Sequence, residues 1–598
     1  MKRAVGDDVM VEADVFTDGH DAVVAELLWR RVGASEWQVV PMAFLGNDHW
    51  SASFRVEKLG RYEYTVRGWT DPFVTWQRDL RKRQEAGQDL SVDFLIGGAL
   101  SCNPILKDAA RTAEERYQTA IHLRPPPADP SRVLQYERAL QVVVDPVHAR
   151  FSSWYELFPR SVRGDGKHAS FRDLIAFLPE VEAMGFDVLY LPPVHPIGMT
   201  ERKGKNNALK AEPSDVGSPW AIGANEGGHK ALHPQLGTFG DFDALVHAAR
   251  EKGVQIALDI AFQCSPDHPY VREHPEWFRA RPDGTIQYAE NPPKKYQDIY
   301  PFDFESRDWR GLWAELKSIF EFWIGHGATI FRVDNPHTKS FAFWEWCIGE
   351  LKAKHPELVF LAEAFTRPRV MHKLAKLGFT QSYTYFTWRN TRYELAEYFT
   401  ELSQHASREY FRPNVWPNTP DILHETLQHG GRPAFISRLV LATTLAANYG
   451  MYGPAFELME AAPREPGSEE YLNSEKYEIR QWQRDRPDSL RPLITRLNEV
   501  RKENPALQSD WSLRFHPTDN DQLICYSKEA GENLMLVVVN LDPRHSQAGW
   551  VDFDRAPAAS YELHDLVADG HYTWSGRRNF VQLNPHTLPA HVFRVTRK

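Results

Sequence analysis

The stretch that decides the fold is residues 329–363, which read TIFRVDNPHTKSFAFWEWCIGELKAKHPELVFLAE. It opens with an apolar run, Thr329–Val333, that has the length and composition of a buried strand. A helical stretch follows at Phe341–Lys354, and a second apolar run comes at Leu358–Ala362. Strand, helix and strand in this order are typical of a fold built on a parallel sheet.

The same alternation extends from residue 150 to about residue 505. Further strand-like runs are Asp187–Leu191 and Val254–Phe262, and further helical stretches are Phe171–Met184, Phe239–Glu251 and Gly311–Ile324. Strands that alternate with helices over such a length predict a (β/α)8 TIM barrel in the α/β class. A doubly wound sheet is the alternative, but no GxGxxG turn follows the first strands, so nucleotide binding has no support.

The period of the sequence changes on both sides of this region. Short runs rich in Val, Trp, Tyr and Phe precede it, and one helix is expected over 104–122 and a second over Ser131–Val143. The predicted domains are an N-terminal β-sandwich (1–103), a helical hairpin insertion (104–147), the barrel (148–508) with a long Pro- and Gly-rich loop insertion (263–310), and a C-terminal all-β domain (509–598).

Composition places the chain among ordinary globular proteins. Lys plus Arg number 70 and Asp plus Glu 80, so the net charge of −10 excludes a general nucleic-acid-binding protein, which needs a basic surface. The 4 cysteines have no CxxC or CxxH spacing, which argues against a disulfide framework and a zinc site. Acidic residues interrupt Met1–Phe16, and no run approaches the roughly 18 apolar residues of a membrane span. We expect a soluble, cytoplasmic protein.

Acidic residues follow several of the predicted strands. Arg332 and Asp334 are two apart on one strand, so their side chains point the same way, and the guanidinium lowers the pKa of the carboxyl. An ionised carboxylate is what nucleophilic catalysis needs. Glu363 ends the next strand, about 5 Å away, and carboxyls about 5–5.5 Å apart are typical of a retaining glycosidic mechanism.

Each of these residues alone has a simpler interpretation. An Arg-x-Asp on a strand is usually a salt bridge, and an isolated Ala-Glu-Ala carries little information. The signal is their order along one barrel, because active sites of such barrels lie at the carboxyl ends of the strands. Acidic residues end the third, fourth and fifth strands and follow the likely seventh, namely Asp259, Asp334, Glu363 and Asp421.

Five longer stretches carry a resemblance to a known family. They are ALDIAFQCSPDHP (257–269), AENPPKKYQDIYP (289–301), FRVDNPHTK (331–339), KGKNN (203–207) and SEKY (474–477). With the ordered acidic residues, they make the chain resemble the α-amylase superfamily, glycoside hydrolase family 13. Within it the resemblance is closer to bacterial maltosyltransferases, which extend α-1,4-glucan from α-maltose 1-phosphate.

The resemblance implies a role for each matching residue. Asp334 would be the nucleophile and Glu363 the general acid/base, while Asp421 would stabilise an oxocarbenium-like transition state and Arg332 would orient Asp334. The residues implied to hold the maltosyl unit and nearby groups are Lys203, Gln263, Asp298, Asn335, Lys476 and Tyr477. Those implied to contact the phosphate are Asn291, Lys294 and Tyr296, with Asn335 close by.

The chain departs from general α-amylases at two positions. Gln263-Cys264 stand where those enzymes typically carry an Asn-His pair whose Asn binds calcium, so we expect no bound metal and no cofactor. Pro420 precedes Asp421 where they carry a His at the first sugar subsite, which makes simple starch hydrolysis doubtful. Both changes fit the maltosyltransferase branch.

The sequence therefore predicts a retaining glycosyltransferase that moves maltosyl units from α-maltose 1-phosphate to the non-reducing end of α-1,4-glucan, releasing phosphate. The resemblance also implies a homodimer that acts in glycogen metabolism. Two alternatives stay open at this point. One is an α-amylase-family hydrolase or a transglycosylase with another donor. The other is a non-catalytic glucan-binding scaffold that has kept the barrel.

Overall fold

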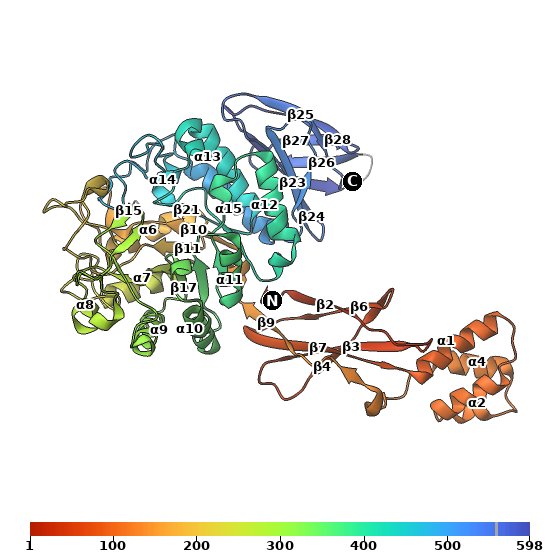
Figure 1. The fold of residues 1–598 in the computed structure, drawn as a ribbon. Helices are drawn as coiled ribbons and strands as arrows, with labels where there is room; N and C mark the ends of the chain where they lie inside the picture. The colour runs from red at the N-terminus through yellow and green to blue at the C-terminus, as the bar shows by residue number, and fades with distance from the viewer. Residues whose placement is uncertain (293, 556–559, 598) are drawn as a thin grey trace. The chain divides into compact units, whose positions relative to one another are not determined.

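The computed structural model describes residues 1–292, 294–555 and 560–597. The chain divides into two compact units, Met1–Val144 and Asp145–Lys598 (Figure 1). No helix in the described ranges has both the length and the apolar character that crossing a lipid bilayer demands.

The larger unit is built on an eight-stranded parallel sheet, as predicted. Its order is β19-β18-β17-β12-β11-β10-β21-β20, and Ser382 of β19 also pairs in parallel with Pro413 beside β20, which brings the two edges together as a barrel. The strands are β10 (Ser152–Glu156), β11 (Val188–Leu191), β12 (Gln255–Ile260), β17 (Ile330–Val333), β18 (Val359–Ala362), β19 (Gln381–Ser382), β20 (Asn414–Val415) and β21 (Asn448–Tyr452).

Helices follow the strands and cover the barrel (Figure 1). The predicted helices Phe239–Glu251 and Phe341–Lys354 are confirmed. A capping box at Thr238 and Asp241 explains why the first of these begins where it does. The helices of this unit are α6 (Phe171–Ala183), α7 (Phe239–Glu251), α8 (Pro269–Glu273), α9 (Trp309–Gly325), α10 (Phe341–Lys354), α11 (Pro368–Leu377), α12 (Arg392–Gln404), α13 (Glu425–Leu445), α14 (Gly453–Glu457) and α15 (Arg491–Glu503), after the single turn α5 (Val147–Arg150).

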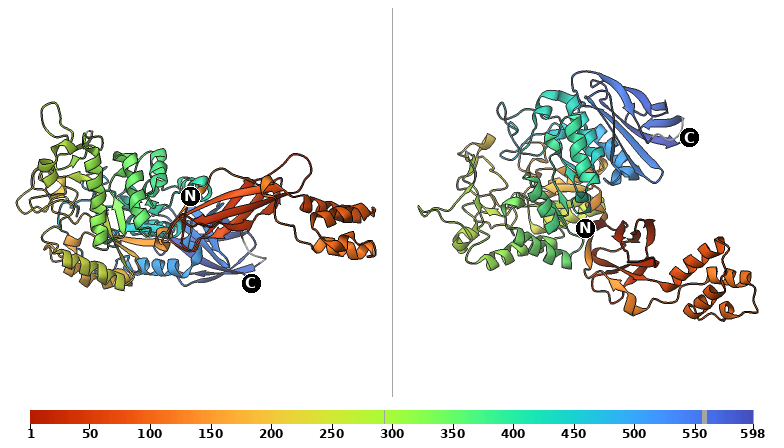
Figure 2. Two further views of the ribbon diagram at one scale, coloured as in Figure 1. Left: turned by 90° about the horizontal axis from the view of Figure 1, so that it is seen from below. Right: turned by 45° about the vertical axis from the view of Figure 1, so that its right-hand side comes forward.

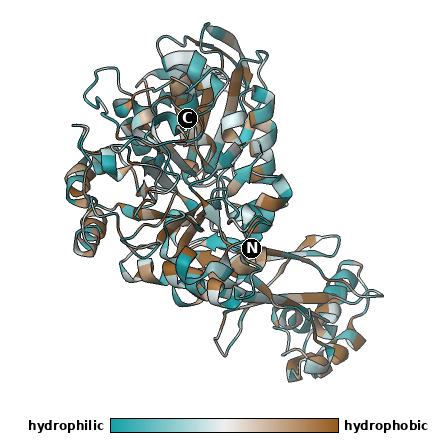
Figure 3. Cartoon of the chain, turned by 60° about the vertical axis from the view of Figure 1, so that its left-hand side comes forward, coloured by the Kyte–Doolittle hydropathy of each residue, from teal (hydrophilic) through white to brown (hydrophobic). Residues whose placement is uncertain are grey.

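The core lies between the barrel strands and these helices. On α9 the buried residues Leu312, Leu316, Ile319, Phe320 and Trp323 recur at helical spacing and form one apolar face. Figure 3 shows hydrophobic and hydrophilic residues alternating along such helices. Burial of each such apolar side chain stabilises the folded state by about 1.5–3 kcal/mol. The packed barrel therefore holds the residues at its strand ends in fixed positions.

The long connection after the third barrel strand has structure of its own. It contains a short antiparallel pair, β13 (Gln263–Cys264) with β16 (Tyr300–Pro301), and a hairpin of β14 (Ala289–Asn291) with β15 (Lys294–Tyr296). The hairpin register sets Asn291 opposite Lys294.

The C-terminal part is all-β, as predicted. One sheet has the order β22-β23-β24-β29-β26-β27, and β25 pairs with β28. The strands are β22 (Arg514–His516), β23 (Leu523–Ala530), β24 (Asn533–Asn540), β25 (Gln547–Asp552), β26 (Ser560–Asp565), β27 (His571–Ser575), β28 (Arg578–Leu583) and β29 (Ala590–Arg597).

The smaller unit holds two sheets and a group of helices, which Figures 1 and 2 show gathered at one end of the sheets. The sheet orders are β1-β9-β7-β3-β4, with β8 on β7, and β2-β6-β5. The strands are β1 (Lys2–Ala4), β2 (Asp8–Asp14), β3 (Val23–Arg31), β4 (Gln38–Pro41), β5 (Ala43–Gly46), β6 (His49–Arg55), β7 (Gly60–Thr70), β8 (Leu134–Gln135) and β9 (Leu140–Asp145).

The helices of this unit correct two predictions. The helix expected over Ser131–Val143 is wrong, because the Val142, Val143 and Val144 run forms strand β9 on β7. The helical region instead comes earlier in the chain, where Asp71 caps the first helix ahead of Pro72. Its helices are α1 (Pro72–Glu85), α2 (Ser91–Leu100), α3 (Pro104–Lys107) and α4 (Ala113–His122), so the single helix expected over 104–122 is two.

Candidate active site

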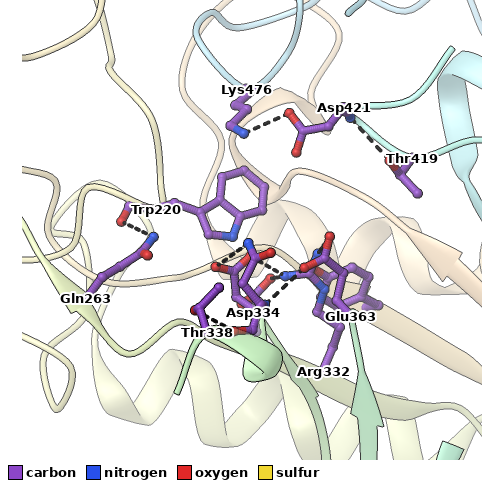
Figure 4. A network of polar contacts seen from close by, with 12 residues as sticks. Trp220, Gln263, Arg332, Asp334, Thr338, Glu363, Thr419, Asp421 and Lys476 are labelled. Atoms are coloured by element: carbon purple, nitrogen blue, oxygen red, sulfur yellow. Dashed lines mark hydrogen bonds and ion pairs between the residues drawn. The ribbon is translucent and has the colours of Figure 1, made fainter. Parts of the chain in front are cut away.

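Two acidic residues leave neighbouring barrel strands at the same level. Asp334 follows β17 and Glu363 follows β18, and the register pairs Val333 with Ala362, directly before them. The backbone N–H of Asp334 donates to the Ile260 carbonyl at 2.9 Å, and that of Glu363 donates to the Val333 carbonyl at 3.0 Å. Sheet hydrogen bonds therefore continue up to both residues and fix their positions. Figure 4 shows the side chains of Asp334 and Glu363 beside each other, with Arg332 next to both.

One buried guanidinium joins the acidic residues. Nη1 of Arg332 donates to Oδ1 of Asp334 at 2.8 Å and to Oδ2 of Asp259 at 2.9 Å. Its Nη2 lies 3.6 Å from Oε1 of Glu363. Oδ2 of Asp259 also accepts a hydrogen bond from the Tyr190 hydroxyl at 2.5 Å. Arg332 thus contacts Asp334 directly, and Asp259 is part of the same network.

The two strand-end carboxyls have opposite electrostatic environments. Burial alone would raise the pKa of Asp334, but the cations Arg332 and Lys339 together hold it below its ordinary value. Burial raises the pKa of Glu363 to about 7. The negative charge of Asp334 adds to this increase, and the positive charge of Arg332 opposes it. Asp334 is therefore an anion at neutral pH, whereas Glu363 titrates there and can carry a proton.

Asn335 connects the two carboxyls. Its backbone is left-handed, with φ of 43°, and this turn directs its N–H to Oε2 of Glu363 at 3.0 Å. Its side-chain amide lies 3.4 Å from Oδ2 of Asp334. Asn335 therefore holds both groups from one position, a geometry that the sequence did not reveal.

Asp421 lies in the same cleft and follows β20. Nζ of Lys476 donates to Oδ1 of Asp421 at 2.8 Å, and the side chain of Asp421 is 51% exposed. The same ammonium lies 4.9 Å from the ring centre of Trp220. The carboxylate is thus free to face a ligand on its other side.

The acidic residues open into a cleft of about 1360 Å³. Of the predicted site residues, those whose side chains line it are Gln263, Asn291, Tyr296, Asp334, Asn335, Glu363, Asp421, Lys476 and Tyr477. Arg332 lies beneath them as a buried support, and the buried Lys203 donates to Gln297 at 2.9 Å. Asp298 is also buried. The side chain of Lys294 lies outside the described residues.

The cleft includes residues that the sequence reasoning assigned no role. Trp220, His337, Thr338 and Lys339 line it, as does the segment 464–470. His337 and Lys339 stand in the motif 331–339, so their proximity to Asp334 was a usable signal. No comparable signal in the sequence pointed to Trp220 or to 464–470.

A buried group at the end of the third strand has the composition of a metal site. Ligand atoms of His229, Cys264 and His268 lie within 4.8 Å of one another. However, the Tyr270 N–H donates to Nδ1 of His268, so Nε2 of His268 bears the proton and donates to Nδ1 of His229 at 3.1 Å. Nδ1 of His268 therefore accepts from the Tyr270 backbone and Nδ1 of His229 accepts from His268, so neither ring has a free lone pair for a metal ion. Burial also raises the pKa of the Cys264 thiol, so the group does not suit a cation.

Comparison with known proteins places the chain in a family. It is 52% identical over 634 aligned residues to the alpha-1,4-glucan:maltose-1-phosphate maltosyltransferase of Chlorobaculum tepidum, which covers all of this chain and 94% of that protein. This chain belongs to the maltosyltransferase family. The chain is also 50% identical to the maltosyltransferase of Methylacidiphilum infernorum and 48% identical to that of Salinibacter ruber. These alignments cover all of this chain and 93% and 94% of the two relatives, respectively.

Two family profiles and the solved structures agree with this membership. Residues 1–153 match the maltosyltransferase domain N/S, and residues 515–595 match the family's C-terminal domain. A noncanonic maltogenic alpha-amylase from Thermotoga neapolitana superposes with a TM-score of 0.59 at 17% identity, covering 75% of this chain and 99% of that one. The Geobacillus thermoleovorans alpha-amylase gives 0.57 at 15%, over 75% and 99%. These likenesses show the barrel fold alone.

Proposed function

We propose that this chain transfers maltosyl units from α-maltose 1-phosphate to α-1,4-glucan with retention of anomeric configuration. The observation that carries the proposal is the pair Asp334 and Glu363, held on neighbouring strands around one guanidinium at the floor of the cleft. Membership of the maltosyltransferase family supports the choice of donor and acceptor. The alternatives of another donor and of a non-catalytic scaffold have no observation in their favour.

The first step forms a covalent intermediate. The Asp334 carboxylate attacks the anomeric carbon, the bond from that carbon to the phosphate oxygen breaks, and inorganic phosphate leaves. Glu363 donates its proton to the departing oxygen, a task that suits a carboxyl with a pKa of about 7. The product is a β-maltosyl ester of Asp334. Arg332 orients the nucleophile throughout.

The second step reverses these roles. Glu363, now an anion, takes the proton of a glucan 4-hydroxyl, whose oxygen attacks the anomeric carbon and displaces Asp334. Two inversions restore the α-linkage. Asp421 stabilises positive charge that develops on the sugar in both transition states, since its carboxylate faces the cleft. Water competes poorly where the acceptor sugar completes the site.

The remaining predicted residues bind the substrates. The maltosyl unit is held by Lys203, Gln263, Asp298, Asn335, Lys476 and Tyr477, and the phosphate by Asn291, Lys294 and Tyr296. Asn291 and Tyr296 line the cleft from the β14–β15 hairpin, which supports a hairpin contribution to phosphate binding. The proposal requires neither a metal nor a cofactor. A homodimer, a cytoplasmic location and a place in glycogen synthesis are further parts of it.

Incubation with α-maltose 1-phosphate and glycogen tests the proposal. Phosphate release coupled to chain growth in steps of two glucose units is the expected result. Reducing maltose formed without any need for phosphate would establish a hydrolase instead. An inert protein that still binds glycogen would establish the scaffold.

A further inference from the structure

The cations of the cleft differ in how far their charges are already neutralised. Among described residues that line it, Arg279 pairs with Asp303 at 3.5 Å, Arg464 with Glu465 at 3.0 Å, and Lys476 with Asp421 at 2.8 Å. Lys339 is the exception. Its Nζ donates to the Thr338 hydroxyl at 3.0 Å and to the Asn335 and Asp334 carbonyls at 3.2 and 3.5 Å, all of them neutral oxygens.

These hydrogen bonds are not needed to hold the turn. The Asn335 carbonyl also accepts from the Thr338 N–H at 3.1 Å and from the Thr338 hydroxyl at 2.8 Å. The Asp334 carbonyl lies at the outer limit of a hydrogen bond from Nζ. The turn would therefore persist without the ammonium, so holding the turn does not account for its charge, which also helps to keep Asp334 ionised.

Lys339 lines the cleft together with Asp334 and Glu363, and both carboxyls act on its charge. Its nearest strand-end carboxyls are Asp334, which is already paired with Arg332, and Glu363, which begins the reaction as an acid. In the first step Asp334 becomes a neutral ester, Glu363 loses its proton and becomes an anion, and phosphate leaves as a dianion. An ammonium at this end of the cleft would stabilise the phosphate dianion as a point charge.

We propose that Lys339 is a further substrate-binding residue whose ammonium group binds the phosphate of the donor. The inference rests on the proposed function. It adds to the phosphate ligands of the β14–β15 hairpin one that follows β17, close to Asp334. Lys339 would leave its carbonyl contacts for the phosphate when the donor enters.

Phosphorolysis of glycogen by inorganic phosphate measures this directly, because it gives separate KM values for phosphate and glucan. In Lys339→Gln, which retains a donor but loses the charge, the KM for phosphate should rise about tenfold or more. The KM for glucan should stay within about twofold, and Lys339→Arg should recover much of the phosphate affinity. Lys354→Gln, an exposed lysine on α10, is the matched control and should match the wild type.

An unchanged phosphate KM in Lys339→Gln, or an equal rise for glucan, would overturn the inference. A wild-type enzyme that forms no maltose 1-phosphate would overturn the proposed function instead. If Lys339→Gln fails to fold, the inference can still be tested on the wild-type enzyme. Inorganic phosphate should slow acetylation of Lys339 in the wild-type enzyme, read by mass spectrometry, and leave Lys354 unaffected; equal labelling with and without phosphate would refute the assignment.

Discussion

At the scale of the residue, one arginine organises the chemistry. Arg332 contacts Asp259, Asp334 and Glu363 and is itself buried, so it acts on all three at low dielectric. The acidic residues and this arginine were predictable because they end buried strands in a barrel. The two contacts of Asn335 were not, because they depend on a left-handed turn that spacing does not encode.

Replacing the nucleophile should abolish transfer without unfolding the protein. Asp334→Asn keeps the shape of the side chain but removes the attacking charge, so kcat for chain extension should fall by at least about a thousandfold. Asp283→Asn, in an exposed turn of the loop insertion, is the matched control and should retain wild-type kcat. Activity is measured as phosphate release, and folding by thermal denaturation. Residual transfer above about a tenth in Asp334→Asn would contradict the role of this residue.

The pH dependence of the first step should report both strand-end carboxyls. The raised pKa of Glu363 means that its proton is lost as pH rises through about 7, so kcat/KM for the donor should fall on that side. Asp334, whose pKa is lowered, stays ionised until pH falls below the ordinary range of an aspartate. In Glu363→Gln the alkaline fall should vanish. A wild-type profile that is flat from pH 6 to about 8 would oppose this assignment.

At the scale of the element, prediction succeeded where local signals agree with the fold. The boundaries of α7 and α10 were predictable from helical periodicity and capping residues. The two-residue strand β19 was not, because so short a segment carries no period and owes its conformation to its neighbours in the sheet. The helix predicted over Ser131–Val143 is absent because residues 140–144 pair with β7, and this pairing outweighs the weak helical periodicity of the segment.

The apolar face of α9 should be essential to the barrel. Trp323 is fully buried and its Nε1 donates to the His229 carbonyl at 2.9 Å, so Trp323→Ala should lower the free energy of unfolding by about 3–5 kcal/mol. Trp346 on α10 is 37% exposed, and Trp346→Ala should cost much less. Denaturant unfolding compares the two. Equal losses would mean that the apolar face of α9 is not what stabilises this region.

At the scale of the whole molecule, the larger unit should be sensitive to acid. Burial lowers the pKa of His195 to about 3, of His229 to about 4 and of His268 to about 2. The unfolded chain binds these protons at about pH 6.5, so stability is fully present above that pH and is lost as pH falls toward about 4. The midpoint of denaturant unfolding should therefore decrease between these values. A midpoint that stays constant or increases would contradict the buried, neutral state of these histidines.

Architecture at this scale also limits what the sequence could predict about the cleft. Its walls come from loops after several barrel strands and from the segment 464–470, so residues such as Trp220 and Arg464 meet only when the barrel closes. The strand-end positions could be deduced because closure is implied by the fold. The loop positions required the resemblance or the structure itself.

The covalent intermediate at Asp334 is the claim on which the mechanism depends, and mass spectrometry can detect it. The enzyme would be incubated with an activated 2-deoxy-2-fluoromaltosyl donor, digested, and its peptides mapped. We expect a single fluoromaltosyl ester on Asp334, formed in the wild type and in the Asp283→Asn control but not in Asp334→Asn. Transfer that proceeds without any adduct, or an ester on a different carboxylate, would contradict the account.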